Sequence, residues 1–424
     1  MDERIYREYV AILKEELQPA MGCTEPIAVA YCAALARKTL GALPETVEVL
    51  ASANIIKNVK SVIVPNTNGQ RGIAAAAAAG IVSDNADAQL QVLASLTPEQ
   101  VDAVGAYLRQ AVFTVRRADK DYVFDIQVRV TAGADSASVE IAGYHTNVIR
   151  IEKNGVVQFH KDYQESSSQH ATDRSLLTVE QIIAFANEVD IADVQETLQR
   201  QIDYNWAIAE EGLRGDYGAN IGRILLQSYG MSIHNRAKAY AAAGSDARMN
   251  GCDLPVVINS GSGNQGLTAS LPVIVYAKEL GVTQQMLYRA LVVSNLVTIH
   301  LKTGIGSLSA YCGATAAGCG AAAGVTYLYG GQFREIAHTV VNAIAIDSGM
   351  ICDGAKASCA AKIASAVEAG LLGMQMQMHE SQFYGGDGIV VKGVENTIRN
   401  IGTLASEGMR ETDRTIIRMM IQEH

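Results

Sequence analysis

The sequence predicts an α+β protein in which a mostly helical domain carries a smaller inserted α+β domain. Aromatic residues make up only 6% of the 424 residues, whereas Ala and Gly are abundant, and small side chains let helices pack closely. Stretches rich in β-forming residues occur only before about residue 165. From Thr178 onward the apolar pattern is almost wholly helical, with breaks at Gly. A chain of this length is also expected to form two domains.

The first 40 residues predict two helices separated by a loop. Residues 2–18 are amphipathic, as expected for a helix that covers a core. The loop Pro19–Pro26 follows, and an Ala-rich helix then extends to about Leu40. Thr24 is a suitable N-cap residue, and Pro26 suits the first helical turn. We expect both helices to pack on the helices of the C-terminal region.

Residues 41–165 predict the inserted α+β domain. Thr46–Ser52 is expected to be a strand, and residues 72–81 and 98–112 are expected to be helices. Four β-rich segments follow, at residues 122–131, 136–144, 147–152 and 156–160, with the turn Lys153-Asn-Gly155 between the last two. Polar residues 164–173 fit a linker. The expected division is therefore residues 1–40 with 166–424, and residues 41–165.

Charge and hydropathy exclude several classes of partner. The net charge is −10, and the sequence has no Lys/Arg stripe, so nucleic-acid binding is not expected. The first ten residues are charged and amphipathic, unlike a signal peptide. The most apolar segments, Leu267–Ala277 and Ala290–Ile299, are too short or too polar to span a bilayer. We therefore expect a cytoplasmic protein without membrane partners, which can form a homo-oligomer.

Seven cysteines, an odd number without a secretion signal, indicate thiols or metal ligands rather than a disulfide framework. Two similar segments, at 312–319 and 352–359, each carry two cysteines seven residues apart before an Ala-rich helix. Seven helical residues rise about 10 Å, which is too far for both sulfurs of a pair to reach one small cluster if the helix is continuous. Each pair should therefore supply one ligand, and the first cysteine is favoured because helix N-termini stabilise thiolates.

The candidate ligands are three cysteines at predicted helix starts, namely Cys23, Cys312 and Cys352. Cys32 and Cys319 fall inside Ala-rich helices and are expected in the core, while Cys252 lies in a loop with an open role. Cys359 comes within reach if the segment after Cys352 is a loop. Two alternatives stay open: either all seven cysteines are small buried hydrophobic residues, or three of them bind a structural zinc ion.

The segment Asn259–Gly266 contains the spacing G-x-G-x-x-G. A dinucleotide site would also need a returning strand and an acidic residue for the ribose, whereas helices are expected after this segment. A group of backbone N–H donors that binds a small anion, such as a carboxylate, fits better. The accompanying polar side chains are Ser260, Ser262, Asn264 and Gln265. The alternative is a tight turn that leads into a helix.

Other polar candidates lie in loops, where functional residues are common. His145 is in the turn between two predicted strands. His300 and Lys302 precede a Gly-rich run that leads to Cys312. A further anion-binding arrangement is expected before the Ala-rich helix 73–79, formed by Asn66, Asn68 and Arg71.

Several motifs resemble the L-cysteine desulfidase family, which belongs with the α-chain domain of iron–sulfur L-serine dehydratases. The matching segments are Met21–Pro26, Ser260–Gly266 and Met350–Lys356, and the resemblance covers essentially the whole chain. Lys302–Cys312 and Gly349–Asp353 also resemble dehydratase signatures: a Lys with a Ser/Gly-rich run before a cluster cysteine, and a Cys-Asp motif.

The resemblance implies a [4Fe–4S] cluster held by Cys23, Cys312 and Cys352 in the helical, catalytic domain. It implies elimination of sulfide from L-cysteine to give pyruvate, ammonia and hydrogen sulfide, without pyridoxal phosphate. Dehydratases have a further ligand cysteine after the Cys-Asp motif. Cys359 is the nearest match here, but it is closer than in that pattern.

Two functional questions stay open at this point. The Gly-Cys-Thr-Glu-Pro motif at 22–26 favours an L-cysteine desulfidase over an L-serine dehydratase, which is the alternative enzyme. Lys302 and His145 are the candidates for the base that removes the α-proton. The segments Ser260–Gly266 and Asn66–Arg71 are the candidates that hold the carboxylate of the amino-acid substrate.

Overall fold

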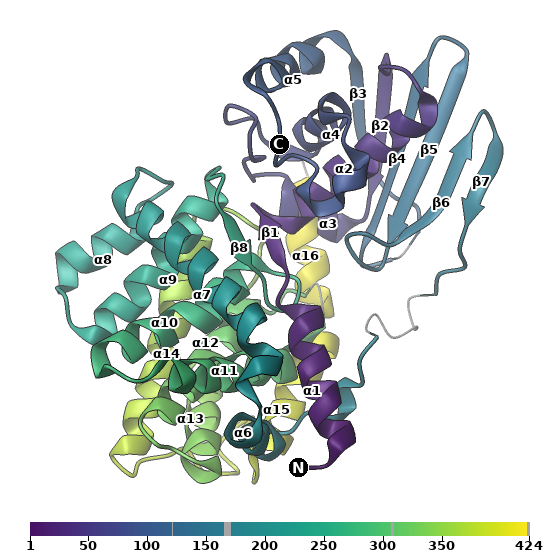
Figure 1. The fold of residues 1–424 in the computed structure, drawn as a ribbon. Helices are drawn as coiled ribbons and strands as arrows, with labels where there is room; N and C mark the ends of the chain where they lie inside the picture. The colour runs from purple at the N-terminus through teal and green to yellow at the C-terminus, as the bar shows by residue number, and fades with distance from the viewer. Residues whose placement is uncertain (121, 165–170, 307–308, 422–424) are drawn as a thin grey trace.

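The computed structural model describes residues 1–120, 122–164, 171–306 and 309–421. Figure 1 shows a sheet with its helices in one part of the molecule and a large group of helices in the other. The expected fold class, α+β and mostly helical, is confirmed. Most of the expected linker, residues 165–170, lies outside the described residues.

The main sheet has six strands in the order β3-β2-β4-β5-β6-β7. β2 pairs in parallel with β3, and all other neighbours are antiparallel. One face is apolar, because alternate residues such as Val49, Val128 and Ile141 are buried. The strands are β2 (Thr46–Ala51), β3 (Val112–Arg117), β4 (Asp125–Ala132), β5 (Asp135–Ala142), β6 (Val148–Lys153) and β7 (Val156–His160). β3 was not expected from the sequence, and its first residue, Val112, was assigned to the preceding helix.

The apolar face of the sheet is covered by α2 (Thr24–Leu40), which in turn packs on α4 (Gly72–Ser83). The sequence prediction that α2 packs on the C-terminal helices is therefore wrong. α2 is Ala-rich and buried on nearly every side, so it fits between a sheet and a second Ala-rich helix. We propose that the first domain boundary lies near Cys23 rather than Gly41. The remaining helices here are α3 (Ala53–Val59), η1 (Ala86–Gln91) and α5 (Pro98–Gln110).

The crossing of α2 and α4 depends on Gly80. A Cβ atom at this position would overlap the carbonyl oxygen and carbon of Ala30. We expect Gly80→Ala to lower the free energy of unfolding by about 1–3 kcal/mol, because overpacking forces the two backbones apart. Gly349→Ala is the matched control, since nothing lies within 4 Å of its Cβ position. Equal urea midpoints for the two variants would show that the crossing is looser than described.

The second part is built around α10, α11 and α12, which are buried along most of their length. Its helices are α1 (Glu3–Glu16), α6 (Val179–Glu188), α7 (Ile191–Arg214), α8 (Ile221–Tyr229), α9 (Ile233–Met249), α10 (Gly263–Leu280), α11 (Gln284–Ile305), α12 (Gly313–Leu328), α13 (Phe333–Ile346), α14 (Cys359–Met378), α15 (Val394–Thr403) and α16 (Arg410–Ile421), with the short turns η2 (Arg174–Leu176) and η3 (Leu404–Gly408). Within the described residues, none of the helices is long and apolar enough to cross a membrane.

Two connections hold the parts together at the cysteine-bearing segments. β1 (Pro19–Met21), just before Cys23, pairs with β8 (Pro255–Val257), just before Asn259–Gly266, which we call the glycine loop. The C-terminal helix α16 lies against α3, where Lys57 Nζ and Asp413 Oδ1 form an ion pair of 2.5 Å. Both connections place distant segments of sequence beside one another between the two parts.

Candidate active site

A cavity of about 110 Å³ between the two parts is lined by four of the seven cysteines, Cys23, Cys312, Cys352 and Cys359. Cys23 is the N-cap residue of α2, and Cys312 is the N-cap residue of α12. Cys352 lies in the loop before α14, and Cys359 is the first residue of that helix. The structure therefore brings together the three predicted ligands and the fourth cysteine whose role was open.

The backbone holds Cys312 and Cys352 side by side. The N–H of Cys312 donates to the carbonyl of Met350 at 2.9 Å, and the N–H of Cys352 donates to that of Ala310 at 2.7 Å. The Cys312 thiol donates a hydrogen bond to the Cys352 sulfur, which raises the pKa of Cys312 and lowers that of Cys352. Burial raises the pKa of Cys23 to about 12, and Arg248 opposes this effect.

The prediction that Cys352 begins a helix is wrong, because α14 begins only at Cys359. The loop between them turns at Gly354, whose φ of 93° excludes an α-helix. A Cβ atom at Gly354 would overlap the Lys57 carbonyl oxygen, so this loop packs tightly on α3. The alternative in which a loop brings Cys359 within reach is the one observed. Cys359 packs in a small apolar cluster with Cys23.

The other three cysteines lie away from the cavity. Cys32 is buried between α2 and the sheet, where its sulfur lies 3.4 Å from the Val139 carbonyl oxygen. Cys319 is buried in the core around α12, as expected. Cys252 is buried in the loop before β8 and contacts Tyr217.

Three helix N-termini meet at the cavity. Cys23, Ser262 and Cys312 are the N-cap residues of α2, α10 and α12, and none of these side chains accepts a hydrogen bond from its own helix. The first N–H groups of a helix have no partner within it and carry partial positive charge. Such an arrangement favours a negatively charged group in the cavity.

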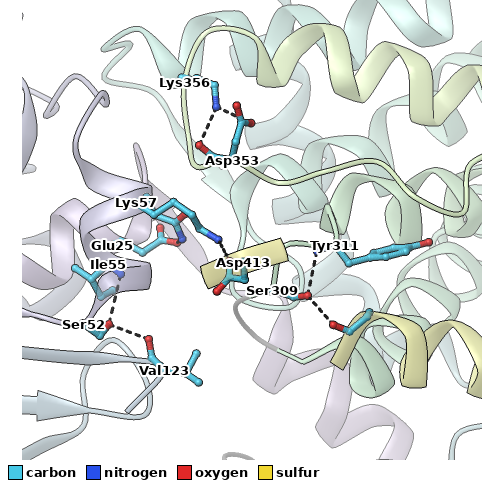
Figure 2. A network of polar contacts seen from close by, with 12 residues as sticks. Glu25, Ser52, Ile55, Lys57, Val123, Ser309, Tyr311, Asp353, Lys356 and Asp413 are labelled. Atoms are coloured by element: carbon cyan, nitrogen blue, oxygen red, sulfur yellow. Dashed lines mark hydrogen bonds and ion pairs between the residues drawn. The ribbon is translucent and has the colours of Figure 1, made fainter. Parts of the chain in front are cut away.

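Four cationic side chains add to this potential, namely Lys57, Arg248, Lys302 and Lys362. Figure 2 shows Lys57 directed toward Asp413, and Lys362 forms an ion pair with Asp353. Burial lowers the pKa of Lys302 to about 8, and its Nζ donates to the Gly306 carbonyl.

The four cysteines are the possible metal ligands of this cavity. In the described ranges, no three His, Cys, Asp or Glu side chains are grouped as ligands of a single metal ion. An iron–sulfur cluster differs from a single ion in that it takes thiolate ligands, spaces them more widely and carries negative charge with them. Four cysteines, three helix N-termini and four cations around one cavity fit that group.

A second cavity of about 570 Å³ adjoins the first and shares Glu25, Ser262, Gln265 and Lys302 with it. His145 lines only this second cavity, with Ser260. The ring of His145 packs edge-on against Phe124, with 4.9 Å between the ring centres, and burial lowers its pKa. Both candidate bases thus line the larger chamber, but only Lys302 also lines the cysteine cavity.

The glycine loop separates the two cavities. Asn264 lines the cysteine cavity, Ser260 lines the larger one, and Ser262 and Gln265 line both. Thr24 Oγ1 of α2 donates to the Gly261 carbonyl at 3.1 Å, which ties this loop to the Cys23 segment. α10 and α11 follow the loop, so the returning strand of a dinucleotide site is absent from these described residues.

The predicted anion site before α4 lies elsewhere. Asn66 and Asn68 line a separate cavity of about 460 Å³ and neither lines the cysteine cavity. The Asn66 amide donates to the Leu93 carbonyl at 2.9 Å, and Arg71 donates to that of Ser61 at 3.4 Å. These contacts tie the segment before α4 to neighbouring backbone. His300 Nε2 and Glu395 Oε2 share a hydrogen bond of 2.6 Å.

Sequence reasoning missed several cavity residues, of which Arg248, Lys57 and Glu25 are the clearest. A signal existed for Arg248, since a charged residue near the end of the Ala-rich segment 233–249 is unusual in a buried helix. Lys57 gave no signal, because it resembles any lysine of a short amphipathic helix. Its burial depends on α16, which is more than 350 positions away.

The fold and site define an α+β protein in which two parts of one chain meet at the cysteine cavity, which is also lined by lysine side chains. Residues 87–418 match the model of the serine dehydratase alpha chain family, and the chain belongs to that family. This membership confirms the resemblance and, at family level, supports a lyase related to the iron–sulfur serine dehydratases.

Relatives align along nearly the full chain. A UPF0597 protein of Desulfitobacterium hafniense is 56% identical over 421 residues, covering 99% of this chain and 98% of that protein. A UPF0597 protein of Lachnoclostridium phytofermentans is 48% identical over 417 residues, covering 98% and 100%. One from Bacteroides fragilis is 38% identical and covers 99% of both chains. These names specify no substrate.

Proposed function

We propose that this protein is an iron–sulfur lyase that eliminates sulfide from L-cysteine without pyridoxal phosphate. The products are pyruvate, ammonia and hydrogen sulfide. The observation that carries the proposal is the convergence of Cys23, Cys312 and Cys352 on one cavity, with Cys23 and Cys312 at helix N-termini and Cys352 in the loop before α14. Membership of the serine dehydratase alpha chain family supports the same class of chemistry.

Cys23, Cys312 and Cys352 would hold a [4Fe–4S] cluster, with Cys359 close enough to the same cavity to contribute. When bound, a cluster with three protein ligands supplies an iron that is open to act as a Lewis acid toward the leaving group. The lysines and the helix N-termini around the cavity balance the negative charge of the thiolates.

The larger cavity would receive the amino acid, and the residues shared with the cysteine cavity would contact its reacting end. Lys302 is the favoured base because it lines both cavities and its lowered pKa leaves part of the population neutral near pH 8. It takes the α-proton as the carbon–sulfur bond breaks. The aminoacrylate product then reacts with water to give pyruvate and ammonia. His145, which lines only the larger cavity, is the second candidate.

An L-serine dehydratase is the second candidate function, and the family match is the observation that favours it. The same residues would then eliminate water instead of sulfide. The two functions differ only in the leaving group, sulfide or water, and the Gly-Cys-Thr-Glu-Pro motif at 22–26 is the feature that favours sulfide.

The test is anaerobic reconstitution of the full chain with iron and sulfide, followed by assays with L-cysteine and L-serine. We expect pyruvate and sulfide from L-cysteine with kcat/KM at least about 10-fold above that for L-serine, a difference of about 1.4 kcal/mol in transition-state binding. A chelator should abolish turnover. The opposite preference would identify a dehydratase, and stoichiometric zinc without labile sulfide would identify a structural metal site.

A further inference from the structure

Arg248 is a buried cation at the cysteine cavity whose charge is not matched by an acid. It lies in the last turn of α9, is only 4% exposed and lines the cavity. The neighbouring Lys57 and Lys362 each form an ion pair with an aspartate. Among the described residues, no Asp or Glu forms such a pair with Arg248. A buried charge without a counter-ion is unfavourable, so a bound anion is expected to complete this site.

The hydrogen bonds of Arg248 also indicate that an anion binds beside it. One terminal nitrogen of its guanidinium donates to Asn264 Oδ1 at 3.1 Å, which fixes the side chain against the glycine loop. Its Nε is buried and makes no hydrogen bond with the described residues. Gln265 Oε1, on the same turn, is also buried without a partner in the described chain. Each buried and unpaired polar group needs an explanation, and these two lie next to one another at the same cavity.

The first turn of α10 lies directly against this guanidinium. A Cβ atom at Gly263 would overlap Arg248 Nε and lie 2.7 Å from its Cζ. The Ser262 side chain does not cap the helix, so the first N–H groups of α10 are open to an anion. A guanidinium and a helix N-terminus, from different segments of sequence, thus form two halves of one anion site.

We infer that Arg248 and the first turn of α10 bind the carboxylate of the amino-acid substrate, an inference that rests on the proposed function. A planar guanidinium matches a carboxylate with two parallel hydrogen bonds. Ser262 and Gln265 line both cavities, so a carboxylate held there lies between the larger chamber and the cysteines. Lys302 lines both cavities as well, which places a base beside the same ligand. Arg248 is then a specificity-determining residue.

Arg248 also lies near enough to Cys23 to favour its thiolate. An alternative role follows from this proximity. In that role the guanidinium stabilises the thiolate that holds the cluster and does not contact the substrate. The two roles predict different losses when the charge is removed. Loss of a carboxylate partner weakens only ligands that carry a carboxylate, whereas loss of a cluster partner lowers iron content.

The experiment measures binding to the reconstituted full chain by anaerobic calorimetry, with two thiol ligands. 3-Mercaptopropionate has a carboxylate and cysteamine does not. We expect Arg248→Met to weaken 3-mercaptopropionate binding about 10- to 100-fold and to change cysteamine binding less than about 3-fold. Arg248→Lys should weaken 3-mercaptopropionate binding to an intermediate degree, because it keeps the charge but loses the planar guanidinium that forms two parallel hydrogen bonds. Iron content should equal that of the unsubstituted protein, and KM for L-cysteine should rise more than kcat falls.

Arg289→Met is the matched control, because this half-buried arginine of α11 donates to the Ala186 carbonyl and does not line the cavity. If Arg248→Met fails to fold, Gly263→Ala tests the same site by displacing the guanidinium, and the same selective loss is expected. Equal weakening of both ligands, or lost iron with unchanged ligand selectivity, would overturn the inference. So would failure of the unsubstituted protein to bind 3-mercaptopropionate. Absence of L-cysteine turnover, with selective binding intact, would instead contradict only the proposed lyase activity.

Discussion

Replacing Cys312 or Cys352 with Ala is expected to abolish the iron–sulfur absorbance and to reduce sulfide release from L-cysteine at least about 100-fold. Changes to residues that merely support metal ligands already cost about 10- to 100-fold in affinity or activity, so loss of a direct ligand should cost more. The measurements are iron and labile-sulfide content after anaerobic reconstitution, together with the rate of sulfide production.

Cys319→Ala is the matched control, because Cys319 lies on the same helix as Cys312 but is buried in the core. It should keep its cluster and its activity, with a loss of unfolding free energy of about 1 kcal/mol. Full cluster content in Cys312→Ala or Cys352→Ala would remove the basis of the proposed function. Cys359→Ala separates three ligands from four: retained iron and activity would leave Cys23, Cys312 and Cys352 as the ligands.

Lys302→Met is expected to lower kcat for L-cysteine by about 10²- to 10⁴-fold while the iron content is unchanged, because a positioned base contributes a factor of that size. Lys302 is 6% exposed and lines both cavities, so the substitution removes a proton acceptor without opening the core to solvent. Steady-state kinetics and iron analysis on the same preparation provide the measurement.

Two variants serve as controls for this result. Lys362→Met removes another cavity lysine, one that is already paired with Asp353, and should lower kcat less than about 10-fold. His145→Gln removes the second candidate base, which does not line the cysteine cavity. A large loss in His145→Gln together with near-normal turnover in Lys302→Met would assign the α-proton to His145 instead.

Local sequence patterns predicted elements more reliably than their packing. The helices of the C-terminal region and strands β2, β4, β5, β6 and β7 follow from apolar periodicity and turn residues. α2 was correctly expected to be a helix. It was expected to pack on the C-terminal helices, whereas it packs on the sheet and on α4. An Ala-rich helix has no strongly apolar stripe to show which surface it covers, so only the close approach at Gly80 and the fit to the sheet decide its position.

In the candidate site, too, local features could be predicted from the sequence, whereas tertiary contacts could not. The sequence by itself placed Cys23 and Cys312 at helix starts, because the residues that start those helices are local, although Thr24 was the expected N-cap residue before α2 and Cys23 is the observed one. Only the tertiary structure decided that Cys352 lies in a loop, since that depends on the packing of Gly354 against the distant Lys57 backbone. The same loop brings Cys359 to the cavity, and the pairing of α9 with the glycine loop buries Arg248 there. Helix starts are encoded over a few residues, whereas burial and charge pairing arise from contacts between segments far apart in sequence.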